Sequence, residues 1–229
     1  MHFLDIADRV SEVRQRIGAA VAQGGHGQHV TIIAVTKTQG AQAVEAAWRA
    51  GLGDVGENRV QEALQKMDET SAPVRWHLIG HLQRNKVKGT VERFALVHSI
   101  DSERLAQAVH EYGESRGTPV DVLIQVNTSG EESKGGFTLA ELPAQSERIA
   151  GFTGMRVRGA MTMAPLDAPR GELRRVFGGA REARAILQRS CGPLVTELSM
   201  GMSNDYEVAV EEGATMVRLG TILFGARDQ

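Results

Sequence analysis

The chain alternates between short, continuous apolar runs and longer stretches in which apolar residues recur at helical spacing. The run at 30–35 represents the first kind, because it is rich in valine and isoleucine, as in a strand that is buried on both faces. Eight such runs predict strands, at 30–37, 54–58, 76–81, 96–101, 120–127, 155–164, 195–201 and 215–220.

Helical spacing fills the intervals between these runs. Before the first run, it predicts a helix over residues 1–24, where Gly24 and Gly25 end the pattern. The apolar face of this helix consists of Phe3, Ile6, Val10, Val13 and Ile17. Three later faces are predicted in the same way: Ala41, Val44, Ala47 and Trp48; Leu105, Ala108, Val109 and Tyr112; and Leu173, Val176, Phe177, Ala180 and Leu187.

Strand–helix alternation predicts parallel strands joined by right-handed crossovers. Eight such units in 229 residues fit a single (β/α)8 barrel of the TIM type, with the N-terminal helix as an addition. A doubly wound open sheet is the competing arrangement. However, residues 36–40, which follow the first strand, lack the glycine spacing of a dinucleotide fingerprint. No linker or repeat divides the chain, so we expect one α/β domain over residues 1–229.

Composition narrows the classes of function. The chain has 26 basic and 28 acidic residues, and its net charge of −2 does not favour a nucleic-acid partner. No apolar run approaches the roughly 20 residues of a membrane helix, and the charged N-terminus does not resemble a signal peptide. Cys191 is the only cysteine, which excludes an internal disulfide and a multi-cysteine metal site. We therefore expect a cytoplasmic protein that binds neither nucleic acid nor membrane.

Residues with useful chemistry fall just past the predicted strand ends, which in a parallel barrel line one common mouth. Lys37 ends the first strand. A desolvated lysine amine reacts with carbonyl compounds, so this position favours Schiff-base chemistry, although a solvated lysine is the simpler interpretation. The other candidates at the mouth are Glu57, Asn58, His81, Asn127, Met161 to Met163, Ser203 and Arg218.

Two glycine turns near the C-terminus suggest an anion site. Gly201 and Ser203 form a turn that leads into a helix predicted over 203–213, with a Ser/Asn cap at its start, and Gly220 and Thr221 open a short helix after the last strand. Such turns offer unpaired backbone N–H groups, and phosphate sites in barrels often follow strands seven and eight. Glycines at strand ends are equally often plain turns, so this signal alone leaves both interpretations open.

Arg218 lies inside an apolar strand and must find an acceptor or an anion there. Glu197 would be a structural partner, whereas a ring nitrogen or an acidic group of a ligand would be a functional one. His77 and His81 have the spacing of a helical zinc pair, but the segment is predicted as a strand and lacks the glutamate between them, so we expect no metal site.

Two exposed segments complete the set of candidates. The loop at 127–136 is rich in glycine, serine and glutamate, and its Lys134 could act as a lid residue over the mouth. The segment at 82–89, with Arg84, Lys86 and Lys88, is predicted as an exposed basic helix face. No pairing of serine or cysteine with histidine is evident for nucleophilic catalysis.

Seven segments between about Ile32 and Asp228 occur together: AVTKT, GENRVQE, WHLIGHLQRNK, HSIDS, LIQVNTSGEESKGG, RGAMTMAP and LSMGMSNDYEVAVEEGATMVRLGTILFGARD. Their order and spacing resemble the pyridoxal 5′-phosphate (PLP) homeostasis proteins. The resemblance implies a barrel like the N-terminal domain of alanine racemases, without the further β-domain that completes the racemase active site. It also implies a monomer that holds PLP as an internal aldimine.

By this resemblance, Lys37 would be the Schiff-base lysine and Asn58 would lie close to the cofactor ring. Ser203, Gly220 and Thr221 would hold the phosphate, and Arg218 would face the pyridine nitrogen. An arginine at this nitrogen favours the neutral ring and weakens the electron sink. Such a site suits holding and releasing PLP better than turning over amino acids.

The chain departs from the family pattern around its lysine. Thr36, Gln39 and Gly40 stand where members often have serine, lysine and proline. The missing second lysine leaves any role of that position in transfer in doubt. Arg84 stands where a small polar residue is common, which adds positive charge near the rim.

Three functions follow from these residues. The leading prediction is a PLP carrier and homeostasis protein that supplies PLP-dependent apo-enzymes and lacks robust catalysis, with weak side activity left open. The first alternative is a PLP-dependent amino-acid racemase, which needs a second acid or base, commonly a tyrosine, opposite Lys37. Tyr112, predicted in a helix core, and Tyr206 are the two tyrosines of the chain. The second alternative is a Schiff-base aldolase that acts on a phosphorylated substrate without PLP.

Overall fold

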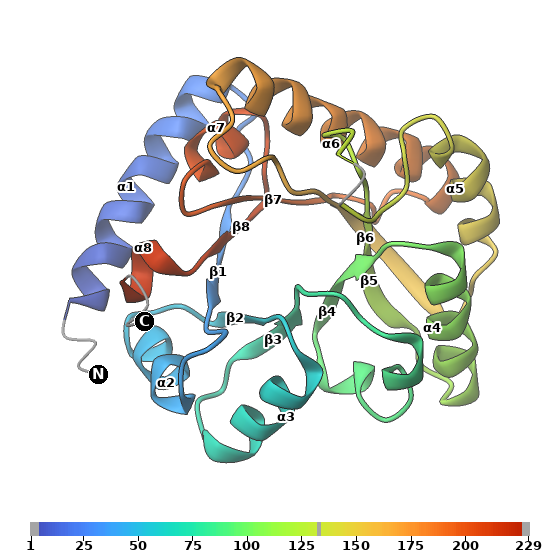
Figure 1. Ribbon diagram of the computed structural model, residues 1–229, viewed down its shortest axis with the longest axis horizontal. Coiled ribbons are helices and arrows are strands. Elements are labelled where there is room, and N and C mark those ends of the chain that lie inside the picture. Colours follow the sequence, from blue (N-terminus) through green and yellow to red (C-terminus); the bar gives the residue numbers. More distant parts are fainter. Residues whose placement is uncertain (1–4, 132–133, 226–229) are drawn as a thin grey trace.

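The computed structural model describes residues 5–131 and 134–225. Within these ranges, eight parallel strands close into a barrel in sequence order, and helices surround it (Figure 1). The strands are β1 Thr31–Val35, β2 Asp54–Glu57, β3 Arg75–Leu78, β4 Leu96–Ile100, β5 Val120–Gln125, β6 Met155–Met161, β7 Glu197–Met202 and β8 Met216–Leu219. The α-helices are α1 Ile6–Gly24, α2 Ala41–Arg49, α3 Val60–Glu69, α4 Glu103–Ser115, α5 Leu142–Ala150, α6 Arg170–Cys191, α7 Tyr206–Glu211 and α8 Thr221–Phe224, and the 3-10 helices are η1 Arg84–Lys86 and η2 Val91–Arg93.

The predicted (β/α)8 barrel is confirmed, and each predicted strand has an observed counterpart. The third strand is shorter than predicted, because β3 ends at Leu78 and the chain then leaves the sheet. Gly80 follows this end, and a Cβ atom there would lie 2.2 Å from the carbonyl oxygen of Asn58. The backbone after β3 therefore approaches the residue after β2 at a distance that only glycine permits.

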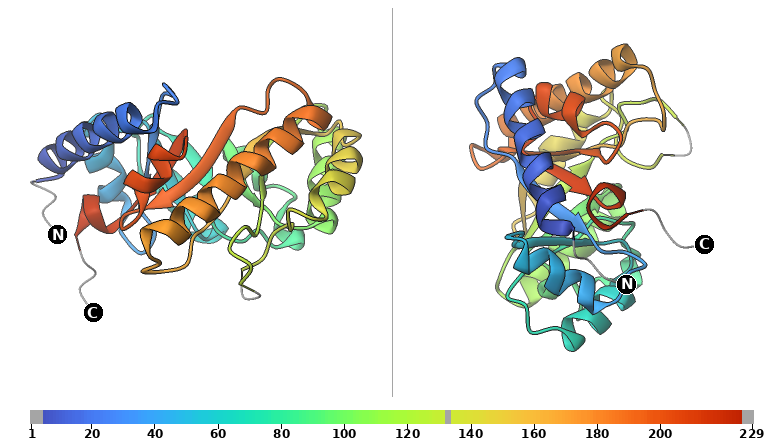
Figure 2. Two further views of the ribbon diagram at one scale, coloured as in Figure 1. Left: turned by 90° about the horizontal axis from the view of Figure 1, so that it is seen from above. Right: turned by 90° about the vertical axis from the view of Figure 1, so that its left-hand side faces the viewer.

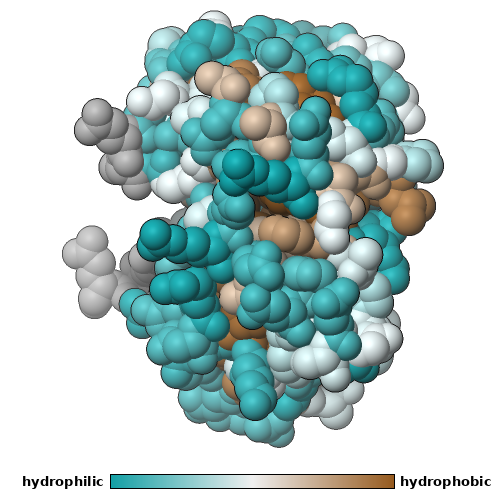
Figure 3. Space-filling view, turned by 90° about the vertical axis from the view of Figure 1, so that its right-hand side faces the viewer, coloured by the Kyte–Doolittle hydropathy of each residue, from teal (hydrophilic) through white to brown (hydrophobic). Residues whose placement is uncertain are grey.

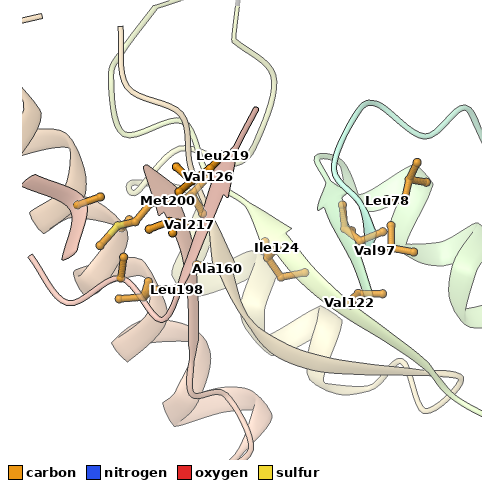
Figure 4. Packing of buried hydrophobic residues seen from close by; sticks show 14 of the residues in the cluster. Leu78, Val97, Val122, Ile124, Val126, Ala160, Leu198, Met200, Val217 and Leu219 are labelled. Carbon is orange, nitrogen blue, oxygen red and sulfur yellow. The ribbon is translucent and has the colours of Figure 1, made fainter. Parts of the chain in front are cut away.

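Side chains of the strands divide between two layers, because successive residues of a strand point to opposite faces. The outward side chains form the main core between the strands and the helices. Figure 4 shows part of this core, with Leu78, Val97, Val122, Ile124, Val126, Ala160, Leu198, Met200, Val217 and Leu219 labelled. Inside the barrel, a small inner apolar cluster consists of Leu96, Leu123 and Met161. The same interior holds buried polar side chains from several strands.

The N-terminal helix α1 packs against α7 and α8 (Figures 1 and 2). It buries Ile6, Val10, Val13, Ile17 and Ala20, which confirms the predicted apolar face within the described residues. Phe3, also predicted for this face, lies outside the described residues, and so does Asp228, the end of the segment that resembles the family. The helix ends where predicted, because Gly25 has φ +70° and its N–H donates to the carbonyl of Val21.

The outer surface is largely hydrophilic on the face in Figure 3, where apolar residues appear as small patches. Trp48 of α2 is 42% exposed, so its predicted place on an apolar helix face is wrong; α2 buries its alanines and Val44 instead. The segment at 82–89 contains the 3-10 helix η1 in place of the predicted helix face. None of the described helices has the length and apolar character to cross a membrane.

Two helical glycines give a matched test of packing. Alanine is favoured over glycine in a helix by about 1 kcal/mol, so Gly18→Ala in α1, where nothing lies within 4 Å of the new Cβ, should stabilise the protein by that order. Gly113→Ala in α4 should destabilise it by about 1–3 kcal/mol, because the Cβ would lie 1.8 Å from the carbonyl oxygen of Gly154. Urea unfolding measures both effects. Equal effects of the two substitutions would contradict this packing.

Candidate functional site

A cavity of about 860 Å³ opens among the residues that follow the strands. Its walls come from segments far apart in the sequence, which the closed barrel brings to one end. All six residues predicted for the site line it: Lys37, Asn58, Ser203, Arg218, Gly220 and Thr221. The barrel therefore assembles the predicted group of side chains around one space.

The residues on both sides of Lys37 are held by carboxylates. Thr36, which follows β1, donates its hydroxyl to Glu57 Oε1 at 2.6 Å. Thr38 has φ +65°, an unfavourable region for a β-branched residue, and its N–H donates to Glu62 Oε1 at 2.6 Å. These bonds fix the turn from which the Lys37 side chain enters the cavity.

A buried lysine connects these two carboxylates. Lys66 of α3 donates from Nζ to the carbonyl of Thr36 at 2.7 Å, to Glu57 Oε1 at 2.7 Å and to Glu62 Oε1 at 2.9 Å. Burial raises the pKa of Glu57, while Lys66 and Thr36 lower it. Glu57 is fully buried and does not line the cavity, contrary to its predicted place at the mouth. Its role is to anchor the turn that carries Lys37.

A hydroxyl and backbone N–H groups gather beside the turn of Lys37, at the end of the neighbouring strand β8. The backbone N–H groups of Gly220 and Ile222 both point to the hydroxyl oxygen of Ser203, each at 3.4 Å. Asp205 closes the preceding turn by accepting the N–H of Met202 at 2.6 Å. The helix after this turn starts at residue 206, three residues later than predicted, and α8 follows the second turn as predicted. A hydroxyl and converging N–H groups form a concave donor set that suits an anion.

Arg218 is buried between the cavity and the barrel interior. It donates from Nη1 to Ser199 Oγ at 2.7 Å and from Nη2 to the carbonyl of Thr162 at 2.9 Å. Glu197, which the sequence offered as a structural partner for Arg218, does not take that role, because its carboxylate accepts the hydroxyl of Thr215 at 2.6 Å. Burial lowers the pKa of Arg218 to about 10, and the charge of Asp205 acts in the opposite direction.

Further polar side chains complete the rim. His81 lines the cavity and contacts Asp101 Oδ2 through Nδ1 at 2.9 Å. Lys134 also lines it, with Nζ 2.6 Å from Glu131 Oε2, so its predicted position at the mouth agrees with the structure. Asn127 does not line the cavity, contrary to its predicted place at the mouth. Its side-chain amide nitrogen donates to the loop carbonyls of Glu131 and Lys134 instead. Asp101 directly follows β4, and this position could have identified it from the sequence.

The remaining candidates lie away from the cavity. Tyr112 is partly buried and packs against the main core, as its helix pattern predicts, and its hydroxyl donates to Glu92 Oε2 at 2.8 Å on the outside of the barrel. Burial raises the pKa of the Tyr206 hydroxyl, and Arg16 of α1 lowers it. Burial also raises the pKa of Cys191 to about 11. Among the described residues, no group of histidine, cysteine and carboxylate side chains is arranged to hold a metal ion.

Comparison with known proteins places the chain in a family. Residues 10–228 match the family model of the alanine racemase N-terminal domain. The pyridoxal phosphate homeostasis protein of Pseudomonas aeruginosa is 43% identical, over 97% of this chain and 96% of that protein. The chain belongs to the pyridoxal phosphate homeostasis protein family. The resemblance that its motifs indicated is thereby confirmed.

Solved structures agree with this family at two levels of similarity. PipY of Synechococcus elongatus PCC7942, determined with PLP bound, is 37% identical with a TM-score of 0.84, and the match covers 96% of this chain and all of that one. Alanine racemase from Corynebacterium glutamicum has a TM-score of 0.74 at 17% identity, and the match covers 98% of this chain but 61% of the racemase. The second likeness concerns the fold alone.

The buried ion pairs beneath Lys37 lead to a test by unfolding. Lys66→Met should destabilise the protein by about 3–5 kcal/mol, because it leaves the buried carboxylate of Glu57 without its cation. The double variant Lys66→Met/Glu57→Leu should recover most of this loss, since it removes both charges. Urea unfolding of the two variants measures the difference. A double variant no more stable than Lys66→Met would show that the lone carboxylate is not the cause.

Proposed function

We propose that this protein binds PLP through a Schiff base on Lys37 and acts as a PLP carrier in homeostasis, without robust catalysis. The observation that carries this proposal is the meeting, in one cavity, of a lysine amine, a buried arginine and a hydroxyl with two N–H groups. The family name and the PLP bound to a 37% identical relative support it.

The donor set fits the chemistry of PLP. A cavity of about 860 Å³ lies within the usual range for small-molecule sites. The amine of Lys37 suits the aldehyde of PLP, and the Ser203 hydroxyl with the N–H groups of Gly220 and Ile222 suits its phosphate. Asn58 would lie close to the ring. PLP held in this way remains protected from other amines until it is released to an apo-enzyme.

The same residues argue against a full enzyme. An arginine at the pyridine nitrogen favours the neutral ring and so weakens the electron sink that carbanion chemistry needs; Arg218 would take this position. Racemisation also needs an acid or base on each side of the substrate, but neither Tyr112 nor Tyr206 lines the cavity.

We propose that the carrier works as a cytoplasmic monomer, with PLP-dependent apo-enzymes as recipients.

The role of Lys37 can be separated from that of Lys134, the other lysine that lines the cavity. On addition of PLP, the wild type and Lys134→Ala should develop the visible absorption band of a PLP Schiff base, whereas Lys37→Ala should not. Borohydride reduction and peptide mapping of the wild type should place the label on Lys37. A band retained by folded Lys37→Ala would mean that another amine carries PLP, and a colourless wild type would favour the aldolase alternative.

Catalysis can be tested directly with the PLP-loaded protein. We expect L-alanine to keep its optical purity over many hours of incubation, because the cavity offers no tyrosine opposite Lys37. Chiral chromatography of the amino acid measures this, with a bacterial alanine racemase as the positive control. Loss of optical purity at a rate comparable with the control would establish the racemase alternative.

A further inference from the structure

A row of buried polar side chains crosses the interior of the barrel and ends at the cavity. We call it the buried chain; its members are Asp54, His77, His98, Ser199 and Arg218, from β2, β3, β4, β7 and β8. Each is at most 6% exposed. Four contacts of hydrogen-bond length link them in this order: Asp54 Oδ1 to His77 Nε2 at 2.8 Å, His77 Nδ1 to His98 Nε2 at 2.9 Å, His98 Nδ1 to Ser199 Oγ at 2.9 Å, and Ser199 Oγ to Arg218 Nη1 at 2.7 Å.

The chemistry of the end groups sets the direction of these hydrogen bonds. A guanidinium can only donate, so Ser199 accepts from Arg218 and its own hydrogen is left for His98 Nδ1. His98 Nδ1 is then an acceptor, and the neutral ring carries its hydrogen on Nε2, which donates to His77 Nδ1. His77 in turn donates from Nε2 to the carboxylate of Asp54. In this arrangement every contact contains one hydrogen.

The opposite direction requires an additional proton. If His98 donated from Nδ1 to Ser199, its Nε2 would need a hydrogen from His77 Nδ1. His77 would then have to be an imidazolium to donate to Asp54 as well, or that carboxylate would have to be protonated. The hydroxyl hydrogen of Ser199 would also lose its acceptor in the buried chain. Burial lowers the pKa of His98 well below its usual value, and the charge of Arg218 acts in the same direction, which agrees with a neutral ring.

We propose that the buried chain is a positioning device: it fixes the guanidinium of Arg218 in the cavity wall and couples it, through a directed row of hydrogen bonds, to the distant carboxylate of Asp54. Hydrogen bonds in a buried row polarise one another, so a negative charge at one end strengthens the bond at the other. The position and charge of Arg218 at the ligand would thus depend on Asp54, the first residue of β2. For the identity of the ligand, this inference rests on the proposed function.

A purely structural role predicts a different outcome from a positioning role. Polar groups that only fill the barrel interior would contribute to stability and would not alter ligand affinity at the far end. The protein offers a matched pair of aspartates for this distinction, one inside the buried chain and one outside it. Asp54 forms an ion pair with Arg75, and Asp121 forms one with Arg156; in both pairs the partners are directly opposed on neighbouring strands. Of the two aspartates, only Asp54 belongs to the buried chain.

The test compares PLP dissociation constants of the full-length protein and its variants, measured by absorbance titration. Asp54→Asn keeps the shape of the side chain and removes the charge, and we expect a Kd about fivefold higher, the order of a typical coupling between distant sites. Ser199→Ala removes the direct acceptor and should raise the Kd about tenfold or more. Asp121→Asn should leave it unchanged. Equal effects of Asp54→Asn and Asp121→Asn would overturn the proposal.

Nitrogen-15 NMR of the histidine rings in the PLP-free wild type gives a second readout, independent of ligand binding and of any variant. We expect His77 and His98 to be neutral, each with its hydrogen on Nε2. Detection of an Nδ1 hydrogen on His98, or of an imidazolium at His77, would overturn the proposal. A wild type that shows the expected ring states but does not bind PLP would instead contradict the proposed function, so the two failures are distinguishable.

Discussion

The interior of this barrel is organised by the need to compensate one buried positive charge. Arg218 lies within eight parallel strands, where an unpaired guanidinium would be strongly unfavourable. Its hydrogen-bond acceptors, the carbonyl of Thr162 and the hydroxyl of Ser199, are neutral. Along the row of hydrogen bonds a carboxylate is reached at Asp54, through two histidines, while the charge of Asp205 acts on Arg218 from the cavity. Barrels of this type usually fill their interior with branched apolar side chains. Here the inner apolar cluster is small, because the polar row occupies much of the same space.

The wall that carries the reactive amine follows the same physical rule, that a buried charge needs compensating partners. Lys66 is buried, and its charge is compensated by Glu57 and Glu62 beneath the turn that presents Lys37. Removing one partner of such a group leaves an unpaired charge, so these side chains constrain one another and the turn between them. Buried charged groups therefore hold both the turn of the amine, which follows β1, and the arginine, which lies on the neighbouring strand β8. The backbone N–H groups of Gly220 and Ile222, which follow β8, carry no net charge and need no such compensation.

The barrel and the residues around its mouth could be predicted from the sequence, because parallel strands buried on both faces appear as continuous apolar runs. The positions of Lys37, Ser203 and Arg218 near the carboxyl ends of those predicted strands were enough to predict that they lie at one mouth. The polar interior could not be predicted in this way. Whether a residue such as His98 faces inward depends on strand register, and a shift by one residue reverses every side chain. Its contact with Ser199 joins residues 101 positions apart, and barrel closure alone brings them together.

A crystal structure of the protein grown with PLP tests the central claim most directly, because it locates the amine, the phosphate and the guanidinium at once. The account predicts continuous electron density from Lys37 Nζ to the ligand, with the phosphate beside Ser203 and Gly220. Arg218 should face the ring while it keeps its contact with Ser199. PLP attached elsewhere, or an arginine that has left Ser199 to reach the ligand, would contradict a site assembled in advance by buried charges.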